Sequence, residues 1–399
     1  MQDTFIIDGI RTAIGSFRGG LSSVRTDDLA AHVIRSLINR HENLDPALID
    51  DVIMGCANQA GEDNRNVARM ALLLAELPYT VPGETINRLC ASGMSAVVHA
   101  HRAIQAGDGD IFIAGGVENM TRGPWVTSKA DQAFGTNVEM HDSSFGWRFI
   151  NPRMEKLYGT DSMGETAENL ATMYAISRID QDRYAYNSQR KAVAAKSVFK
   201  EEITSIMIPR KKQEPTVFDK DEFMKPQTTL EGLAALRPAF REGGTVTAGN
   251  SSGLNDGAAA ILIASENGAR QHNLKPLAKI VSSAVVGVEP RIMGIGPVTA
   301  TQQALKKAGL KLDDIEVIEI NEAFAAQVLA CTRALGLEDE DERVNKYGGA
   351  IAMGHPLGMS GARLILSAAR TLQRLDKKYA LATMCIGVGQ GYAVVLEKI

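Results

Sequence analysis

Two stretches of the chain decide how it is organised: ETINRLCASGMSAVV at residues 84–98 and YGGAIAMGHPLGMSGARL at residues 347–364. In each stretch a reactive side chain stands three positions before Gly-Met-Ser, Cys90 in the first and His355 in the second. A match this short can arise by chance, but the segments around it also follow one another in the same order. We therefore predict an internal duplication, in which each half brings one reactive residue to the start of a helix.

The order of the predicted elements repeats in the two halves. Apolar segments typical of strands lie at 5–10, 50–56, 111–116, 279–288, 317–321 and 379–385, and helical periodicity is found at 27–40, 92–106, 299–310 and 359–375. At the offset that separates Cys90 from His355, Cys56 pairs with Asn321. Ser92 is the expected N-cap of the helix after Cys90. Strands that alternate with helices predict an α/β fold of parallel sheets with helices on their faces.

Between the two halves the composition changes. Residues 117–247 hold both tryptophans and the charged stretch PRKKQEPTVFDKDEFMKP, with helices expected at 163–174 and 180–198. An insertion of this size can wall a cleft at a sheet edge. We expect an N-terminal half made of residues 1–116 and 248–272, an inserted domain at 117–247, and a C-terminal half at 273–399.

Composition excludes several classes of protein. The 399 residues carry 43 Lys+Arg against 47 Asp+Glu, a net charge of −4, and no basic block that would favour nucleic acid. No apolar run approaches the roughly 18 residues of a membrane span, and the N-terminus does not resemble a signal peptide. The four cysteines form no C-x-x-C pair and no zinc-ligand spacing, so neither a disulfide framework nor a metal site is predicted. We expect a cytoplasmic protein.

Three segments carry the residue types of nucleophilic catalysis. Cys90 follows a short extended segment and precedes a helix, and the positive end of a helix favours a thiolate, although a buried structural cysteine is the alternative. His355, between Gly354 and Pro356, is a candidate base for that thiol. Cys385 ends a strand before glycines whose backbone N–H groups can bind an oxyanion. A dinucleotide site is disfavoured there, because a strand and not a helix follows.

Together these segments resemble those of thiolases over essentially the whole chain. The segments that match the family's motifs are NRLCASGM at 87–94, NEAFA at 321–325, NKYGGAIAMGHPLGMSG at 345–361 and MCIGVGQG at 384–391. The resemblance implies a thiolase fold, an internally duplicated five-layer α-β-α-β-α core with a loop domain inserted in its first half. It also implies that this loop domain contributes a wall for coenzyme A and contacts between subunits of a homodimer or homotetramer.

The resemblance implies a covalent mechanism. His355 would deprotonate Cys90, which would attack the 3-keto carbon of a 3-oxoacyl-CoA, and Cys385 would protonate the acetyl-CoA carbanion. The enolate oxygen would meet His355 and a water held on Asn321. The tetrahedral oxyanion would meet the backbone N–H groups of Cys90 and Gly387.

Coenzyme A is then a co-substrate, with no permanently bound cofactor. The resemblance places Ser252 near the pantetheine and Lys225 near the nucleotide. The pantetheine tunnel would be lined by Met163, Met293, Ala323 and Phe324. Many family members have His where this chain has Ser162, which leaves that contact open.

The identity of the substrate depends on longer segments. GLSSVRTDD at 20–28, CANQAGEDNRNVARM at 56–70, FGWRFINP at 145–152 and GVEPRIMGIGP at 287–297 resemble thiolases of aromatic-acid breakdown that act on 3-oxoadipyl-CoA. A distal carboxylate needs a cation, and Arg148 is the candidate, with a surface or inter-subunit ion pair as the alternative. The other functions considered are a biosynthetic acetoacetyl-CoA thiolase, a ketoacyl-synthase-like condensing enzyme, which would need a second histidine, and a silent relative, which would lack a reactive residue.

Overall fold

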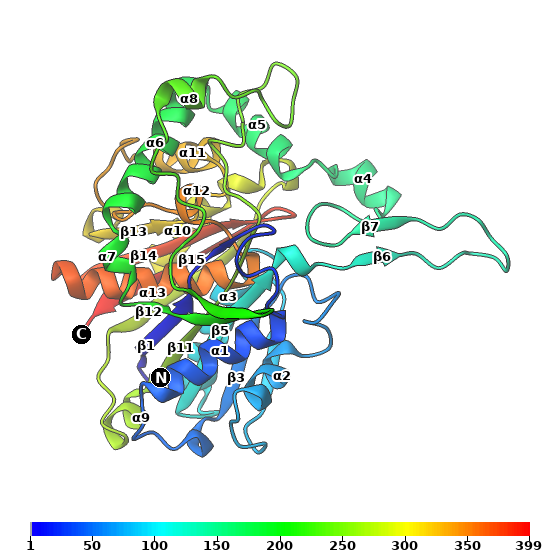
Figure 1. The fold of residues 1–399 in the computed structure, drawn as a ribbon. Helices are drawn as coiled ribbons and strands as arrows, with labels where there is room; N and C mark the ends of the chain where they lie inside the picture. The colour runs from blue at the N-terminus through cyan, green and yellow to red at the C-terminus, as the bar shows by residue number, and fades with distance from the viewer. Residues whose placement is uncertain (1) are drawn as a thin grey trace.

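The computed structural model describes residues 2–399 and is built on one mixed sheet with the strand order β13-β14-β15-β12-β1-β11-β5-β3-β4 (Figure 1). The strands of this path are β1 (Thr4–Thr12), β3 (Asp51–Gly55), β4 (Gly83–Ile86), β5 (Ile111–Asn119), β11 (Asn255–Ser265), β12 (Ala278–Gly287), β13 (Val317–Ile320), β14 (Tyr379–Ile386) and β15 (Gln390–Lys398). The core helices are α1 (Thr26–Asn39), α2 (Val67–Leu74), α3 (Ser92–Ala106), α9 (Glu266–Gln271), α10 (Gly296–Ala308), α11 (Ala325–Ala334), α12 (Ala350–Met353) and α13 (Leu357–Leu375).

The sheet consists of two halves joined at its centre. The β1–β12 pairing is short, running through Phe5 with Lys279 and Ile6 with Ala278. Parallel pairing joins β3 to β4 and β5, and β13 to β14, whereas β1, β11, β12 and β15 pair antiparallel with their neighbours. The prediction of parallel sheets is therefore wrong for β1, β11, β12 and β15. The turn between β14 and β15 is too short for the crossover that a parallel connection requires.

Three apolar cores separate the layers. Helices α3 and α13 lie between the half-sheets, while α1 and α2 cover the outer face of the first half-sheet and α10 and α11 that of the second (Figure 1). Alternate residues of one strand serve different cores: Phe112 of β5 packs in the central core and Ile113 in the outer one. This two-residue period fits a strand covered by helices on both faces. The predicted five-layer arrangement is confirmed.

The insertion adds elements above and beside this core. They are β6 (Trp125–Thr127), β7 (Met140–Asp142), α4 (Pro152–Tyr158), α5 (Met163–Met173), α6 (Arg178–Ala194), α7 (Lys196–Phe199), β8 (Ile203–Thr204), β9 (Ile206–Arg210), β10 (Gln213–Phe218) and α8 (Leu230–Ala234). Strands β6 and β7 form an arm that projects from the body, whereas α5, α6 and α8 lie over the second half (Figure 1). The boundaries proposed for the inserted domain stay a prediction. Across residues 2–399, no helix is both long and apolar enough to cross a membrane.

Glycines let α3 and α13 approach closely where they begin. A Cβ atom on Gly93 would lie 2.4 Å from the carbonyl oxygen of Gly358, and one on Gly361 would lie 2.4 Å from the backbone nitrogen of Met94. Real Cβ atoms do not come so near, so only glycine fits this crossing. The crossing brings together the helix starts that follow Cys90 and His355.

Candidate active site

Cys90 lies on a sharp turn between β4 and α3. Leu89 has a φ of 48°, in the left-handed region that side chains rarely adopt. The Ser92 hydroxyl donates to the Leu89 carbonyl at 2.6 Å and accepts from the Arg88 N–H at 2.9 Å. The N-cap residue is Ala91, so the prediction of Ser92 as the cap is wrong. Ser92 instead stabilises the strained turn before the helix through these two hydrogen bonds, and this turn carries the Cys90 thiol.

The charge state of Cys90 is set by opposing effects. Burial raises the pKa of the Cys90 thiol, and hydrogen bonds from the backbone N–H groups of Gly387 and of Cys90 itself lower the pKa by a smaller amount. The net pKa lies above the ordinary value, contrary to the expectation that the helix start favours a thiolate. Cys90 therefore needs a base. The two N–H groups near the sulfur are the pair that the sequence resemblance assigns to an oxyanion hole.

His355 is buried and its tautomer is fixed by its neighbours. Its Nδ1 lies 2.6 Å from the Ser360 hydroxyl oxygen, and that hydroxyl donates to the Pro356 carbonyl at 2.7 Å. Because the hydroxyl proton is used on Pro356, Ser360 accepts from Nδ1–H, and Nε2 carries the lone pair of the ring. Burial, aided by the charge of Arg363, lowers the pKa of His355 to about 3. The imidazole is thus neutral at neutral pH, as a base must be.

Asn321 follows β13 and faces the same imidazole. Its side-chain nitrogen lies 3.3 Å from His355 Nε2, and its backbone N–H donates to the Thr383 carbonyl at 3.0 Å. The side-chain oxygen is buried and has no hydrogen-bond partner among the residues described. Buried acceptors of this kind normally bind a donor. Asn321 is therefore suited to hold a water or a substrate group beside His355.

Cys385 and Gly387 come from the β14–β15 hairpin. Cys385 is buried, and burial, with the nearby Cys90 and Cys331, raises the pKa of its thiol. A Cβ atom on Gly387 would lie 3.3 Å from the Leu89 side chain, so this hairpin abuts the turn of Cys90. The structure thus brings Cys90, Cys385 and Gly387 together. A thiol of raised pKa stays protonated at neutral pH, so it can act as a proton donor and is a poor nucleophile in that state.

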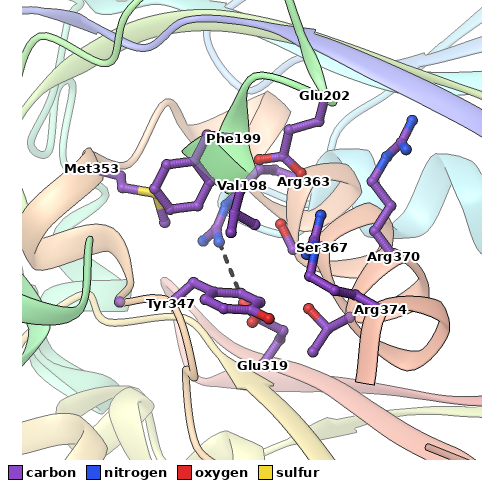
Figure 2. Close-up of a pocket in the computed structure, with 12 residues that line it drawn as sticks. Val198, Phe199, Glu202, Glu319, Tyr347, Met353, Arg363, Ser367, Arg370 and Arg374 are labelled. Atoms are coloured by element: carbon purple, nitrogen blue, oxygen red, sulfur yellow. Dashed lines mark hydrogen bonds and ion pairs between the residues drawn. The ribbon is translucent and has the colours of Figure 1, made fainter. Parts of the chain in front are cut away.

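Figure 2 shows a buried ion pair that the sequence did not single out. Arg363 of α13 and Glu319 of β13 approach to 3.4 Å, and burial raises the pKa of Glu319 to about 7. Glu319 stands two residues before Asn321 on the same strand. A charged residue inside the apolar strand VIEI was the available signal, since unpaired charges are almost never fully buried.

Most of the candidate coenzyme A residues gather near this centre. The Ser252 hydroxyl and backbone N–H both lie within hydrogen-bond distance of the Ala323 carbonyl, at 3.1 and 3.0 Å. Ala323, Phe324 and Met293 pack in one apolar cluster with Cys385. These candidates, which come from distant segments of the sequence, thus pack together beside Cys385.

The two remaining candidates, Met163 and Lys225, are exposed. Met163 is 36% exposed, and its sulfur is 3.8 Å from the point where a Cβ of Gly387 would lie. Lys225 is exposed and stacks over the Phe223 ring at 4.9 Å, and that ring approaches Gly253. The Ser162 hydroxyl accepts from the Glu165 N–H at 3.3 Å, so Ser162 caps α5.

Arg148 lies in the loop after β7 and is half-buried. Its guanidinium donates to the Ser143 carbonyl at 2.9 Å, and no carboxylate within residues 2–399 forms an ion pair with it. The Ser143 hydroxyl in turn accepts from the Asn58 side chain at 3.2 Å, in the loop that follows β3. The preceding residue, Trp147, donates its indole N–H to the Asp161 carbonyl at 3.3 Å, just before α5. The loop of Arg148 is thus fixed between the first half and the insertion.

Comparisons with known proteins agree with this geometry. The family described as thiolase, N-terminal domain matches residues 4–267, and thiolase, C-terminal domain, matches residues 274–398. A 3-oxoadipyl-CoA/3-oxo-5,6-dehydrosuberyl-CoA thiolase of Escherichia coli strain K12 is 57% identical, and a beta-ketoadipyl-CoA thiolase of Acinetobacter baylyi is 54% identical, each with 100% of both chains covered. The crystal structure of the Bacillus anthracis acetyl-CoA acetyltransferase and that of human mitochondrial 3-ketoacyl-CoA thiolase each give a TM-score of 0.92 at 39% identity, over 100% of this chain and 99% of the other. The predicted resemblance and fold are confirmed, and the chain belongs to the thiolase family of acyltransferases.

Proposed function

We propose that this thiolase cleaves 3-oxoadipyl-CoA with a second coenzyme A, giving acetyl-CoA and an acyl-CoA shortened by two carbons. The observation that carries the choice of substrate is the half-buried Arg148, which has no carboxylate partner in the described chain. The names of the full-length relatives from Escherichia coli and Acinetobacter baylyi support the same substrate.

The first half-reaction starts at the Cys90–His355 pair. Nε2 of the neutral His355 takes the thiol proton, and the Cys90 sulfur attacks the 3-keto carbon. The N–H groups of Cys90 and Gly387 bind the resulting oxyanion, which matches their hydrogen bonds to the sulfur. The C2–C3 bond then breaks, and its electrons pass to the thioester enolate, stabilised by His355 and a water on Asn321. Cys385 protonates C2, and acetyl-CoA leaves an acyl group on Cys90.

The second half-reaction returns the enzyme to its starting state. The Cys385 thiolate takes the proton of the incoming coenzyme A thiol. The resulting thiolate attacks the acyl carbon, and the Cys90 sulfur leaves and recovers its proton from His355. Ser252 with the apolar Met163, Met293, Ala323 and Phe324 would hold the pantetheine, and Lys225 the nucleotide phosphates. No cofactor stays bound.

Arg148 would bind the distal carboxylate of the substrate. A planar guanidinium meets a carboxylate with two parallel hydrogen bonds, and leaving that carboxylate buried and unpaired costs roughly 2–5 kcal/mol. We expect Arg148→Ala to lower kcat/KM for 3-oxoadipyl-CoA by at least about tenfold, a loss of ~1.4 kcal/mol. Acetoacetyl-CoA, which lacks the carboxylate, should be almost unaffected. The matched control is Arg153→Ala, because Arg153 is an exposed arginine of the same insertion on α4.

The outcomes separate the candidate substrates. Equal losses on both substrates would make Arg148 structural or a coenzyme A contact, and no loss on either would remove it from the site. A wild-type enzyme with higher kcat/KM on acetoacetyl-CoA would favour the second candidate, biosynthetic condensation of acetyl-CoA. That candidate is supported by the fold of the Bacillus anthracis acetyl-CoA acetyltransferase. A ketoacyl-synthase-like reaction is disfavoured because Cys385 stands where a second histidine would be needed.

We further propose that the enzyme works in the cytoplasm as a homodimer or homotetramer. The inserted domain at 117–247 would supply the subunit contacts, together with the substrate wall. Light scattering of the purified protein tests the oligomeric state.

A further inference from the structure

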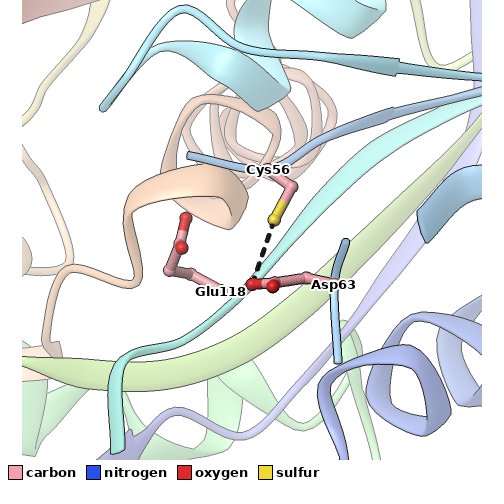
Figure 3. Close-up of side chains that lie close together, drawn as sticks. All are labelled: Cys56, Asp63 and Glu118. Carbon is pink, nitrogen blue, oxygen red and sulfur yellow. Dashed lines mark hydrogen bonds between the residues drawn. The ribbon is translucent and has the colours of Figure 1, made fainter. Parts of the chain in front are cut away.

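Three ligand-type side chains outside the reaction path lie close together between β3 and β5: Cys56, Asp63 and Glu118 (Figure 3). Cys56 donates its thiol proton to Asp63 at 3.6 Å, and Asp63 also accepts from the Gly61 N–H at 2.9 Å. Glu118 is only 1% exposed. The hydrogen-bond donors around the Glu118 carboxylate decide whether the cluster can bind a metal ion.

Both carboxylate oxygens of Glu118 accept backbone N–H groups. Oε2 accepts from Ala57 at 3.0 Å and from Gly358 at 2.9 Å, and Oε1 accepts from Asn58 at 3.1 Å. Because these N–H groups point at the oxygens, a cation placed there would meet their positive hydrogens. The cluster therefore does not fit a metal ion. Glu118 is instead a carboxylate that accepts hydrogen bonds from the backbone N–H groups of two separate segments.

One of those segments is the start of α13, which has no cap of its own. The N-cap residue is Pro356, whose side chain cannot accept a hydrogen bond, and no side-chain cap is formed. The N–H of Gly358, the second helical residue, would otherwise be unsatisfied. Glu118 satisfies it from β5, in the other half of the molecule. A carboxylate at this end also interacts favourably with the helix dipole.

The same contact fixes the helix start in position. A Cβ on Gly358 would lie 2.3 Å from the Val117 carbonyl oxygen and 2.7 Å from that of Gly55, so the first turn of α13 is wedged against β3 and β5. The backbone N–H of His355 donates to the Asn255 side chain of β11 at 2.9 Å. His355 is thus held against the first half from both sides of Pro356.

We propose that Glu118 is a positioning residue for proton transfer: by capping α13 across the two halves, it sets His355 relative to Cys90. The inference rests on the roles proposed above for Cys90 and His355. Burial raises the pKa of Glu118 to about 7, and the three N–H groups that dock the helix oppose that rise because they favour the charged carboxylate. Within residues 2–399, the hydrogen bonds of Glu118 go to Ala57, Asn58 and Gly358 and not to the candidate coenzyme A residues.

The test compares Glu118→Ala, Glu118→Gln and Asp63→Asn. Asp63 is the matched control, since it is a buried carboxylate of the same cluster whose contacts stay within the first half. For Glu118→Ala we expect kcat to fall at least about tenfold with KM within about twofold, and alkylation of Cys90 by iodoacetamide to slow equally. Glu118→Gln should recover most of both rates, because one amide oxygen can still accept from Ala57 and Gly358. Asp63→Asn should stay within about threefold of wild type.

The comparison variant His355→Ala separates the possible failures. If His355→Ala slows alkylation and Glu118→Ala does not, the positioning role is wrong while the base role stands. If His355→Ala leaves alkylation unchanged, the proposed base role is wrong. Equal losses in Glu118→Ala and Asp63→Asn, or a loss confined to KM, would also overturn the inference. If Glu118→Ala does not fold, Glu118→Asp, which shortens the reach by one methylene, carries the same expectation.

Discussion

Replacing Ser360 with alanine should disable His355 without touching a substrate contact. Ser360 is 2% exposed, and its hydroxyl lies between the Pro356 carbonyl and His355 Nδ1. Ser360→Ala leaves the buried Nδ1–H without an acceptor, at a cost of about 1–3 kcal/mol. The ring can relieve this cost by moving its proton to Nε2, once the Asn321 amide, whose nitrogen lies 3.3 Å from Nε2, turns its unpartnered oxygen toward the ring to accept that proton. The lone pair that takes the Cys90 proton is then lost.

The free-energy cost of leaving Nδ1–H without an acceptor can be converted into an expected fall in kcat. At ~1.4 kcal/mol per factor of ten, 1–3 kcal/mol corresponds to a fall in kcat of about fivefold to 150-fold. KM for the acyl-CoA should stay within about twofold, because the interaction lost is one needed for the proton transfer and not for ground-state binding. Rapid-quench measurement of Cys90 acylation, together with steady-state kinetics, separates the two effects.

The matched control is Ser282→Ala. Its hydroxyl is also buried and also donates to a backbone carbonyl, that of Ala304, at 2.7 Å, but it lies on β12 away from the reactive residues. Similar losses in both variants would mean that deletion of any buried hydroxyl disturbs the enzyme. Acylation by Ser360→Ala at the wild-type rate would refute the tautomer argument outright.

Three further perturbations test other parts of the structure. Cys90→Ala should abolish acyl-enzyme formation, whereas Cys385→Ala should still acylate Cys90 slowly; mass spectrometry with acyl-CoA checks this, and a wild-type adduct on Cys385 alone would reverse the roles. Gly387→Ala should keep activity within roughly threefold because its backbone N–H remains, whereas Gly387→Pro, which deletes that donor, should cost about 10²–10³ in kcat. His101 is buried, and burial lowers its pKa to about 4. The unfolded chain, with a pKa near 6.5, binds more protons between those values, so stability falls as pH drops through this window. In urea unfolding at pH 7 and pH 5, the wild type should lose on the order of 2 kcal/mol more than His101→Gln; equal losses would contradict the assigned shift.

Local signals in the sequence predicted the elements well. The helix expected at 92–106 is α3, with the same bounds, and the strand expected at 379–385 is β14, one residue longer. Both segments carry their own pattern: small apolar residues at helical spacing in one, and a buried apolar run in the other. The repeated Gly-Met-Ser segments also predicted correctly that two helix starts belong together, since the structure crosses them at Gly93 and Gly358.

Local sequence patterns did not predict contacts between residues far apart in the chain. The alternation of strands and helices favoured parallel pairing, but the direction of β11 and β15 depends on which neighbours they meet. Ser92 has the residue type of a cap, yet the left-handed Leu89 places it inside the helix. Glu118 was not singled out because its partner Gly358 lies in the other half. The charge state of Cys90 was expected from its helix alone, whereas burial decides it.

The two halves of the chain carry side chains with different roles at equivalent positions. Asn321 ends its strand with a buried acceptor free to serve chemistry, while its counterpart Cys56 is tied to Asp63 and stays within the scaffold. Glu118 has two opposing effects on the site. Its negative charge adds to the raised pKa of Cys90, which by itself slows thiolate formation. A carboxylate that opposes the nucleophile is useful here only because it holds the base. In the proposed mechanism the site therefore relies on a neutral His355 to remove the Cys90 proton during the reaction, and not on a thiolate formed in advance.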